Sequence, residues 1–552
     1  MGKYLIACLF LLIATSSHAQ SLDRAAIATA HPLATEAGHE VLAQGGNAFD
    51  AAIAVTATLA VVEPYSSGIG GGGFWLLHRA SDGKQVMLDG RETAPGRAHR
   101  DMYLDEQGQV RQGASVDGPL AAGIPGVPAA LEHLAKNYGN LPLNKSLATA
   151  IKIANEGFVV DAFYQRMAGF RLKALQASPE AAAIFLDDNE IPDVGYKIKQ
   201  PDLANTLKAI ADKGAAGFYR GVIAQRLVTG SRDAGGIWSL EDLVRYRVIE
   251  RKPLSGMIGQ AKVISVAPPS SGGVALISIL QQIDGFNRLE LNANFDHIVV
   301  EAMRRAYRDR AEFLGDSDFV NVPVHQLISR EHNEMLRRSI NMNDATPSSD
   351  LPKTAVSESA GTDTTHFSIM DKQGNRVAAT LSVNYPFGSG FVVPGTGVLL
   401  NDEMDDFSAK AGVPNVYGLV GAKANEIAPY KRPLSSMSPT FIESPRGVAV
   451  LGTPGGSRII TMVLHGIIDY MNGGNAKTMV SKRRYHHQYL PDVIQYEQGA
   501  FTTQQLADLQ LRGHTLSLQS DYGNMQVVLW ERNSNTLDAA SDPRVIGSAV
   551  IK

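Results

Sequence analysis

We expect an α+β protein, and helical and strand-like patterns occupy different stretches of the chain. Two adjacent helices are predicted near the start, over 33–44 and 48–62, and the middle of the chain, about 125–320, is mainly helical in pattern. From 364 to 384 the pattern changes to alternating polar and apolar residues on either side of a turn, which is typical of a β-hairpin.

The composition is that of an ordinary globular protein. Of 552 residues, 44% are apolar and 19% are charged, which excludes a disordered chain, a coiled coil and a polytopic membrane protein. The net charge of −4 excludes a broadly basic surface for nucleic acid. The single cysteine, Cys8, excludes a disulfide framework, a cysteine zinc site and an iron–sulfur cluster. We therefore expect no metal, no cofactor and no nucleic-acid partner.

Residues 1–19 are predicted to be an export signal peptide. Lys3 supplies a positive charge, 4–14 is an apolar run, and the small-x-small sequence at 17–19 would give a mature chain starting near Gln20. The apolar run is too short for a transmembrane helix, which needs ~20 residues. A retained membrane anchor is the alternative. We expect a protein of the periplasm or the medium, with no membrane attachment beyond the signal peptide.

The two N-terminal helices are followed by a run of glycines. Gly45-Gly46-Asn47 ends the first helix, and the second is alanine-rich and almost wholly apolar, which predicts burial. Residues 68–73 then match G-x-G-x-x-G, but they follow a helix and open a strand, whereas a dinucleotide-binding loop follows a strand and opens a helix. Glycines that let two backbone segments pack closely explain the run better.

The middle of the chain contains helical stretches near 128–137, 147–156 and 203–212, separated by glycine and proline. Residues 298–314 form a helix dense in both signs of charge, for which we expect a solvated face with i,i+4 ion pairs. A polar stretch at 341–363 has almost no apolar periodicity and ends directly at a strand, as a flexible or cleavable connector would.

The predicted hairpin brings particular hydroxyl groups together. Connecting loops of two to four residues all place Thr364 opposite residues 382–384. Ser382 and Asn384 are two positions apart, so they lie on the same face of the sheet.

Common hydrolase signatures are missing from the sequence, which has no G-x-S-x-G, no H-E-x-x-H and no P-loop. The only histidine doublet is His486-His487, and adjacent strand residues face opposite sides, so a structural role is favoured over a metal site. Thr364 remains as a candidate nucleophile. A threonine at a chain start can use its own α-amine, which titrates near ~8, as the base. The alternative is a threonine that merely favours the strand.

Several blocks of sequence resemble the gamma-glutamyltransferases, a family of N-terminal-nucleophile hydrolases. The run Thr364-Thr365-His366-Phe367-Ser368 resembles their processing site. Four further blocks are similar to family motifs and stand in the family order: Asp89-Gly90-Arg91-Glu92-Thr93-Ala94-Pro95, Asn401-Asp402-Glu403-Met404-Asp405-Asp406-Phe407, Pro433-Leu434-Ser435-Ser436-Met437-Ser438-Pro439 and Pro454-Gly455-Gly456-Ser457-Arg458. The likeness spans about 31–544, most of the mature chain.

The resemblance implies a four-layer αββα fold and a precursor that cuts itself between Asp363 and Thr364. The products would be a large subunit, 20–363, and a small subunit, 364–552, which remain together as one catalytic unit. Thr364 would then attack the γ-glutamyl amide of glutathione or another γ-glutamyl compound, and water, an amino acid or a peptide would release the glutamyl group.

The resemblance also implies roles for the other blocks. Arg91 would pair with the substrate α-carboxylate, a contact suited to the planar guanidinium, with Ser435 and Ser436 as hydroxyl partners. The α-ammonium would be held by Asn384, Glu403 and Asp406. Amide groups of Gly455 and Gly456 would form an oxyanion hole. Ser382, at a place where the family usually has threonine, would contact the nucleophile, and Tyr417, in a lid-like 415–418, would cover the site.

Two alternatives remain open. A cephalosporin or glutaryl acylase of the same superfamily acts on a side chain without an α-amine, and the retained Asp406 argues against it. A secreted homologue that never matures and does not catalyse is the other. The segment 481–487 is more basic than the family's usual stretch, and its effect on nearby loops is open.

Overall fold

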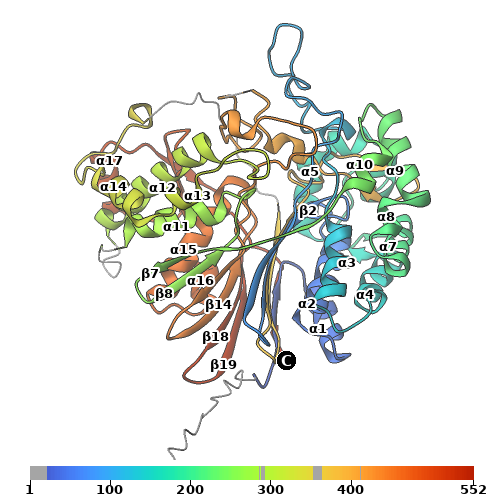
Figure 1. Cartoon of the computed structure of the whole chain (residues 1–552), viewed down its shortest axis with the longest axis horizontal. Helices are drawn as coiled ribbons and strands as arrows, with labels where there is room; N and C mark the ends of the chain where they lie inside the picture. The colour runs from blue at the N-terminus through green and yellow to red at the C-terminus, as the bar shows by residue number, and fades with distance from the viewer. Residues whose placement is uncertain (1–21, 285, 287–291, 352–363, 411) are drawn as a thin grey trace, which may run out of the picture.

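Two β-sheets packed face to face form the centre of the molecule, and helices cover both outer faces, giving four layers (Figure 1). The computed structural model describes residues 22–284, 286, 292–351, 364–410 and 412–552. The predicted signal peptide and Asp363 lie outside the described residues. The four-layer αββα arrangement implied by the resemblance is confirmed.

The first sheet has seven strands and the second has six. In spatial order the first consists of β20 (Ser548–Ile551), β1 (Ala26–Thr29), β9 (Thr365–Met370), β10 (Arg376–Ser382), β2 (Gly72–Arg79), β3 (Lys84–Gly90) and β6 (Ile249–Arg251). The second consists of β19 (Thr536–Ser541), β18 (Gln526–Glu531), β14 (Gly447–Gly452), β13 (Thr440–Glu443), β8 (Ala261–Ser265) and β7 (Leu254–Ile258). Every pairing within these two sheets is antiparallel.

Three smaller sheets complete the strands. They pair β4 (Phe158–Val159) with β5 (Lys197–Ile198), β11 (Val392–Val393) with β12 (Val398–Leu399), and β16 (Ile494–Glu497) with both β15 (Tyr485–His486) and β17 (Leu516–Gln519).

Alternation along the strands creates the layered core. In β14, Val448 and Val450 belong to the apolar cluster between the two sheets, whereas Ala449 and Leu451 belong to the cluster under the helices of the second sheet. Successive strand residues face opposite sides, so a strand covered on both faces needs apolar residues at both parities. This explains why these strands read as continuous apolar runs.

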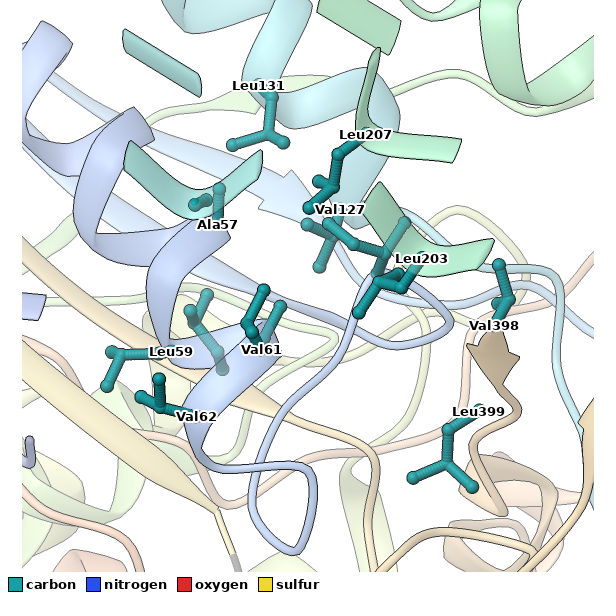
Figure 2. Packing of buried hydrophobic residues seen from close by; sticks show 14 of the residues in the cluster. Ala57, Leu59, Val61, Val62, Val127, Leu131, Leu203, Leu207, Val398 and Leu399 are labelled. Carbon is teal, nitrogen blue, oxygen red and sulfur yellow. The ribbon is translucent and has the colours of Figure 1, made fainter. Parts of the chain in front are cut away.

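Helices from the first half of the chain cover the first sheet. They are α1 (Pro32–Ala43), α2 (Ala48–Val62), α3 (Val127–Asn137), α4 (Leu143–Glu156), α5 (Ala162–Gln176), α6 (Pro179–Phe185), α7 (Pro201–Lys213), α8 (Ala216–Tyr219), α9 (Gly221–Asp233) and α10 (Leu240–Arg245). The predicted helices in this region are confirmed. Every residue of α2 is buried, and Figure 2 shows its Ala57, Leu59, Val61 and Val62 among side chains of α3, α7 and β12.

The second sheet is covered by α11 (Gly272–Ile283), α12 (Ala293–Phe313), α15 (Ile459–Met471) and α16 (Ala476–Ser481), with α13 (Val324–Leu327), α14 (Arg330–Arg338) and α17 (Thr503–Leu511) further out (Figure 1). In the described part of the chain, no helix is long and apolar enough to span a membrane.

Two expectations need correction. The charged helix at 298–314 exists as part of α12, and Glu301 does pair with Arg305 four residues on, but both side chains are buried, so the solvated face was wrong. Helix α12 packs against α11, α14 and α17, so it has little exposed surface, and Glu301 pairs inside with Arg304 and Arg305. The middle of the chain also contributes strands β6, β7 and β8, which its mainly helical pattern did not indicate.

The glycine run at 68–73 serves close packing, as predicted. A Cβ at Gly70 would collide with the main-chain oxygen of Leu399, and one at Gly71 with that of Ser382. The hairpin is also confirmed, because β9 and β10 pair with Leu381 opposite Thr365, which sets Thr364 beside Ser382.

Candidate active site

A pocket opens where β9 begins and β10 ends, and most of the predicted site residues line it. The lining consists of Arg91, Thr364, Ser382, Asn384, Asp406, Tyr417, Leu419, Ser435, Ser436, Met437, Gly456 and Ile459. Of the other predicted residues, Glu403 contacts Arg91 directly behind the pocket and Gly455 precedes Gly456 in the chain. Segments from five separate parts of the sequence therefore meet at one place.

The hydroxyl groups of Thr364 and Ser382 meet in this pocket, with Thr364 Oγ1 3.3 Å from Ser382 Oγ. Ser382 Oγ also accepts a hydrogen bond of 2.8 Å from the main-chain N–H of Asn384. Asn384 has a φ of 76°, a conformation that asparagine adopts more readily than most residues, and its side-chain amide donates to Asp402. The turn after β10 thus holds the serine hydroxyl toward the threonine.

Arg91 follows β3 and is the central cation of the pocket. Its guanidinium is buried and donates to Glu403 and, at 2.5 Å, to Asp406 Oδ2. The main-chain oxygens of Pro433 and Leu434 accept further hydrogen bonds from it at 3.3 and 3.4 Å. The predicted carboxylate-binding arginine and the predicted ammonium-binding acids therefore contact one another directly.

Acidic groups outnumber Arg91 in this cluster. Glu92 Oε2 lies 3.7 Å from the Arg91 guanidinium, and both Glu92 carboxylate oxygens are buried without a hydrogen-bond partner among the described residues. Burial and the negative charge of Glu403 raise the pKa of Glu92 well above its usual range. Burial likewise raises the pKa of Glu403, and the charge of Arg91 opposes that rise. The cluster carries at least one excess negative charge or holds a proton.

Ser435 and Ser436 face the pocket with hydroxyl oxygens that already accept hydrogen bonds. Ser435 Oγ accepts from the main-chain N–H of Met437 at 3.1 Å. Ser436 Oγ accepts from Arg310 at 3.3 Å. A hydroxyl that accepts one hydrogen bond keeps its own proton to donate, so both serines can donate to an anion in the pocket.

Gly456 and Tyr417 are in close contact at the pocket wall. A Cβ at Gly456 would lie 2.6 Å from Cδ1 of the Tyr417 ring, and Gly456 has a φ of 55°, which favours glycine. Gly455 also has a positive φ, of 137°. The Tyr417 hydroxyl donates to the main-chain oxygen of Asn384, and its side chain is buried. Tyr417 therefore forms part of the pocket wall, and its covering role stays a prediction.

The lid-like segment 415–418 is fastened at both ends. The Asn415 side-chain amide donates to Asp406 Oδ1 at 3.0 Å, and its oxygen accepts from the main-chain N–H of Tyr417 at 3.0 Å. From the other side, the Gln488 amide donates to the main-chain oxygen of Gly418 at 3.2 Å.

The basic segment 481–487 is part of a buried ionic network. Arg484 is buried against Asp542, and Arg483 pairs at the surface with Asp521 at 2.7 Å. These ion pairs neutralise the extra basic charge locally. The charges of Arg483 and Arg484 are therefore paired near their own segment. Gln488, the residue after this segment, contacts the lid-like segment 415–418.

Histidines outside the pocket have structural surroundings. His486 and His487 are buried, and His487 Nε2 lies 3.1 Å from Asp492 Oδ1. A group of His297, Glu301 and His514 is compact enough to hold a metal ion. Glu301, however, is paired with both Arg304 and Arg305, whose charges repel a cation there.

Two residues of the site were missed from sequence. Glu92 lies inside the family block 89–95, where the resemblance implies no role for it, and Arg310 lies in a stretch whose charge pattern predicts a solvated helix face. The signal for Arg310 was its spacing, because positions 303, 307 and 310 share one helix face with apolar or aromatic neighbours.

A sequence model of the gamma-glutamyltranspeptidase family matches residues 34–551, nearly the whole chain. The chain belongs to the gamma-glutamyltranspeptidase family.

Characterised relatives of the family agree with this assignment. The chain is 40% identical over 526 residues to the glutathione hydrolase proenzyme of Escherichia coli K12, covering 94% of this chain and 90% of that protein. It is 41% identical over 510 residues to the glutathione hydrolase proenzyme of Pseudomonas sp. strain A14, covering 91% and 88%.

Solved structures show the same fold. A cephalosporin acylase from Bacillus halodurans superposes with a TM-score of 0.83 at 28% identity, covering 96% of each chain. A chain of the Helicobacter pylori gamma-glutamyltranspeptidase matches with a TM-score of 0.57 at 39% identity, covering 93% of that chain but 58% of this one.

Proposed function

We propose that this member of the gamma-glutamyltranspeptidase family is an exported glutathione hydrolase and γ-glutamyltransferase that activates itself by cleaving the bond between Asp363 and Thr364. One observation carries the proposal. Two hydroxyls from opposite ends of a hairpin, on Thr364 and Ser382, lie 3.3 Å apart in a pocket that also contains an arginine, carboxylates and two donating serines.

Cleavage before Thr364 would leave two chains that stay associated through the sheets. In the first sheet, β9 and β10 of the proposed small subunit (364–552) lie between β1 and β2 of the large subunit (20–363). In the second sheet, β13 pairs with β8 across the same division. The Helicobacter pylori chain supports this division. It matches over 93% of its own length but over only 58% of this chain, and the proposed large subunit, 20–363, is about three fifths of this sequence.

The charges of the pocket favour a zwitterionic donor. Arg91 pairs with Asp406 and Glu403 inside the protein. A γ-glutamyl group carries an α-carboxylate for Arg91 and an α-ammonium for Asp406 and Glu403, with Asn384 beside them. Each of these protein charges would therefore face an opposite charge of the donor. The hydroxyls of Ser435 and Ser436 can donate to the same carboxylate.

The reaction then follows from the positions of the groups. The α-amine of Thr364, formed by cleavage, takes the hydroxyl proton while Oγ1 forms a bond to the γ-carbonyl carbon of glutathione. Amide groups of Gly455 and Gly456 stabilise the oxyanion. The carbon–nitrogen bond breaks, and the leaving amine takes the proton from the α-amine. Water, an amino acid or a peptide then attacks the γ-glutamyl ester and restores Thr364.

An acylase is the second candidate, because the cephalosporin acylase of Bacillus halodurans shares the fold. A glutaryl group would supply a carboxylate for Arg91 but no cation for Asp406, and Asp406 would then face the incoming carboxylate as a like charge. The pocket therefore supports the γ-glutamyl donor over the glutaryl one.

Cleavage of two anilides separates these candidates. We expect the purified protein to release p-nitroaniline from the γ-glutamyl p-nitroanilide much faster than from the glutaryl p-nitroanilide. Equal or faster cleavage of the glutaryl anilide would overturn the assignment in favour of an acylase.

Maturation has a separate test. At the mean residue mass of this chain, 59.2 kDa over 552 residues, a denaturing gel of the wild type should show bands of about 37 and about 20 kDa. Thr364→Ala should show one band. The small band should start Thr-Thr-His-Phe and the large one near Gln20. A single wild-type band without anilide cleavage would support an unprocessed, non-catalytic secreted homologue instead.

A further inference from the structure

Arg310 lies directly behind the two pocket serines. Its side chain is buried in α12, and Nη2 donates to Ser436 Oγ at 3.3 Å while Nε donates to Ser271 Oγ at 3.0 Å. Ser271 in turn donates two hydrogen bonds to the main-chain oxygen of Ser435. The hydroxyl oxygen of Ser271 lies 2.7 Å from that oxygen, and the main-chain nitrogen of Ser271 lies 2.8 Å from it. One guanidinium thus supports both serines.

The charge of Arg310 is not neutralised by a direct ion pair. The neighbouring arginines of α12 each have one, since Arg304 and Arg305 pair with Glu301 and Arg308 pairs with Asp309. Among the described residues, no carboxylate oxygen lies within 4.0 Å of the Arg310 guanidinium. A buried cation without an opposite charge is unfavourable, and an anion bound nearby would compensate it.

We propose that Arg310 is a positioning residue for the α-carboxylate of the donor: it orients the Ser436 hydroxyl toward that carboxylate and supplies positive charge behind it. This inference rests on the proposed γ-glutamyl function. Because Ser436 Oγ accepts from Arg310, its proton points away from the guanidinium and is available to the ligand. Arg91 contacts the carboxylate from the pocket, and Arg310 acts through Ser436.

A purely structural role for Arg310 makes a different prediction. If Arg310 only fastened α12 to the pocket wall, its loss would impair every donor alike. If it serves the α-carboxylate, its loss would impair only donors that carry this group. The 4-aminobutyryl anilide is the γ-glutamyl anilide without its α-carboxylate, so the two donors separate the alternatives.

The experiment compares Arg310→Met, Arg310→Lys and Arg308→Met on both anilides. For Arg310→Met we expect KM for the γ-glutamyl anilide to rise about tenfold or more with kcat within about threefold, the scale of one lost charge-assisted contact. The kcat/KM for the 4-aminobutyryl anilide should stay within about twofold of the wild-type value. If this anilide is cleaved too slowly to measure, its inhibition constant should stay within about twofold of the wild-type value instead. Arg310→Lys, which keeps the charge, should recover most of the loss, and Arg308→Met should resemble the wild type.

The outcomes are distinguishable. An equal loss on both donors, or no recovery with lysine, would overturn the role of Arg310 while leaving the proposed function intact. Failure of the wild type to cleave the γ-glutamyl anilide would overturn the proposed function itself. Circular dichroism shows whether each variant folds. The two-band pattern on a denaturing gel shows whether each variant matures.

Discussion

The hydroxyl of Tyr417 donates a hydrogen bond to the main-chain oxygen of Asn384, so the covering segment is fastened to the strand end that carries Ser382. Asn415 ties the same segment to Asp406. The lid-like segment therefore contacts both the Ser382 side and the Asp406 side of the pocket. Through Asn415, the lid-like segment is hydrogen-bonded to the same carboxylate that we propose for the donor ammonium.

Removing the Tyr417 hydroxyl should loosen the lid without removing its ring. For Tyr417→Phe we expect KM for the γ-glutamyl anilide to rise by about three- to tenfold, the equivalent of about 1 kcal/mol for one hydrogen bond. Steady-state kinetics would measure this. Tyr196→Phe, at an exposed tyrosine, is the control. Unchanged KM in Tyr417→Phe would mean that the hydrogen bond does not hold the lid over the donor.

A methyl group at Gly456 should displace Tyr417. The added Cβ would lie 2.6 Å from the ring, so Gly456→Ala should reduce kcat/KM at least about tenfold. Gly473→Ala is a matched control, because Gly473 also has a positive φ, of 90°, but a Cβ there meets nothing within 4 Å. Both variants should lose about 1–2 kcal/mol of stability from backbone strain. Equal kinetics in the two variants would contradict the proposed steric role.

Glu63 should make stability depend on pH. It is buried, accepts a hydrogen bond of 2.7 Å from Thr365, and burial raises its pKa from 4.5 to about 7. A carboxyl whose pKa is raised on folding binds its proton more tightly in the folded state. Its contribution is therefore fully present below about pH 4.5 and is lost as pH rises through about 7.

The test is the free energy of unfolding between pH 4.5 and 8. Glu63→Gln should lessen the decline with rising pH by about 3 kcal/mol, because the neutral amide does not titrate. Glu36→Gln, at an exposed glutamate, should leave the profile unchanged. A parallel profile for wild type and Glu63→Gln would show that Glu63 does not titrate in this range.

Asp492 should stabilise the segment that precedes the proposed cleavage region. Its carboxylate pairs with buried Arg304 and accepts the main-chain N–H of Ser348 at 2.7 Å. Because the Asp492 side chain is 38% exposed, Asp492→Asn should cost only about 1 kcal/mol. Hydrogen exchange at the Ser348 amide should speed up about tenfold.

The control for Asp492 is an exposed ion pair. Asp521→Asn, which breaks the pair with Arg483, should leave both the stability and the Ser348 exchange rate unchanged. Slow exchange at Ser348 in Asp492→Asn would show that Arg304, through its own hydrogen bond to Ser348 Oγ, holds the segment without the carboxylate.

Much of the architecture follows from local patterns in the sequence. The periodicity and caps of 33–62 predict α1 and α2, and a turn between two alternating runs predicts the β9–β10 hairpin, including the placement of Thr364 beside Ser382. These features depend on neighbours a few residues apart, so the sequence alone determines them. The family blocks add the αββα fold, which no local pattern indicates.

Only the tertiary structure decides which charges meet. Arg91 and Asp406 are 315 positions apart, and Arg310 and Ser436 are 126 apart, so no periodicity relates them. The same is true of α12, whose charged residues look solvent-exposed in sequence and are buried because other helices pack around them. The sequence by itself determined the helices of 33–62 and the hairpin of 364–384, and the family resemblance added the candidate nucleophile. Long-range packing decides that Arg310 has no direct ion pair among the described residues, that carboxyl groups outnumber Arg91 around it, and that the lid-like segment contacts the pocket. The electrostatic environment of a residue depends on the groups that surround it in the folded protein and not on its neighbours in the chain.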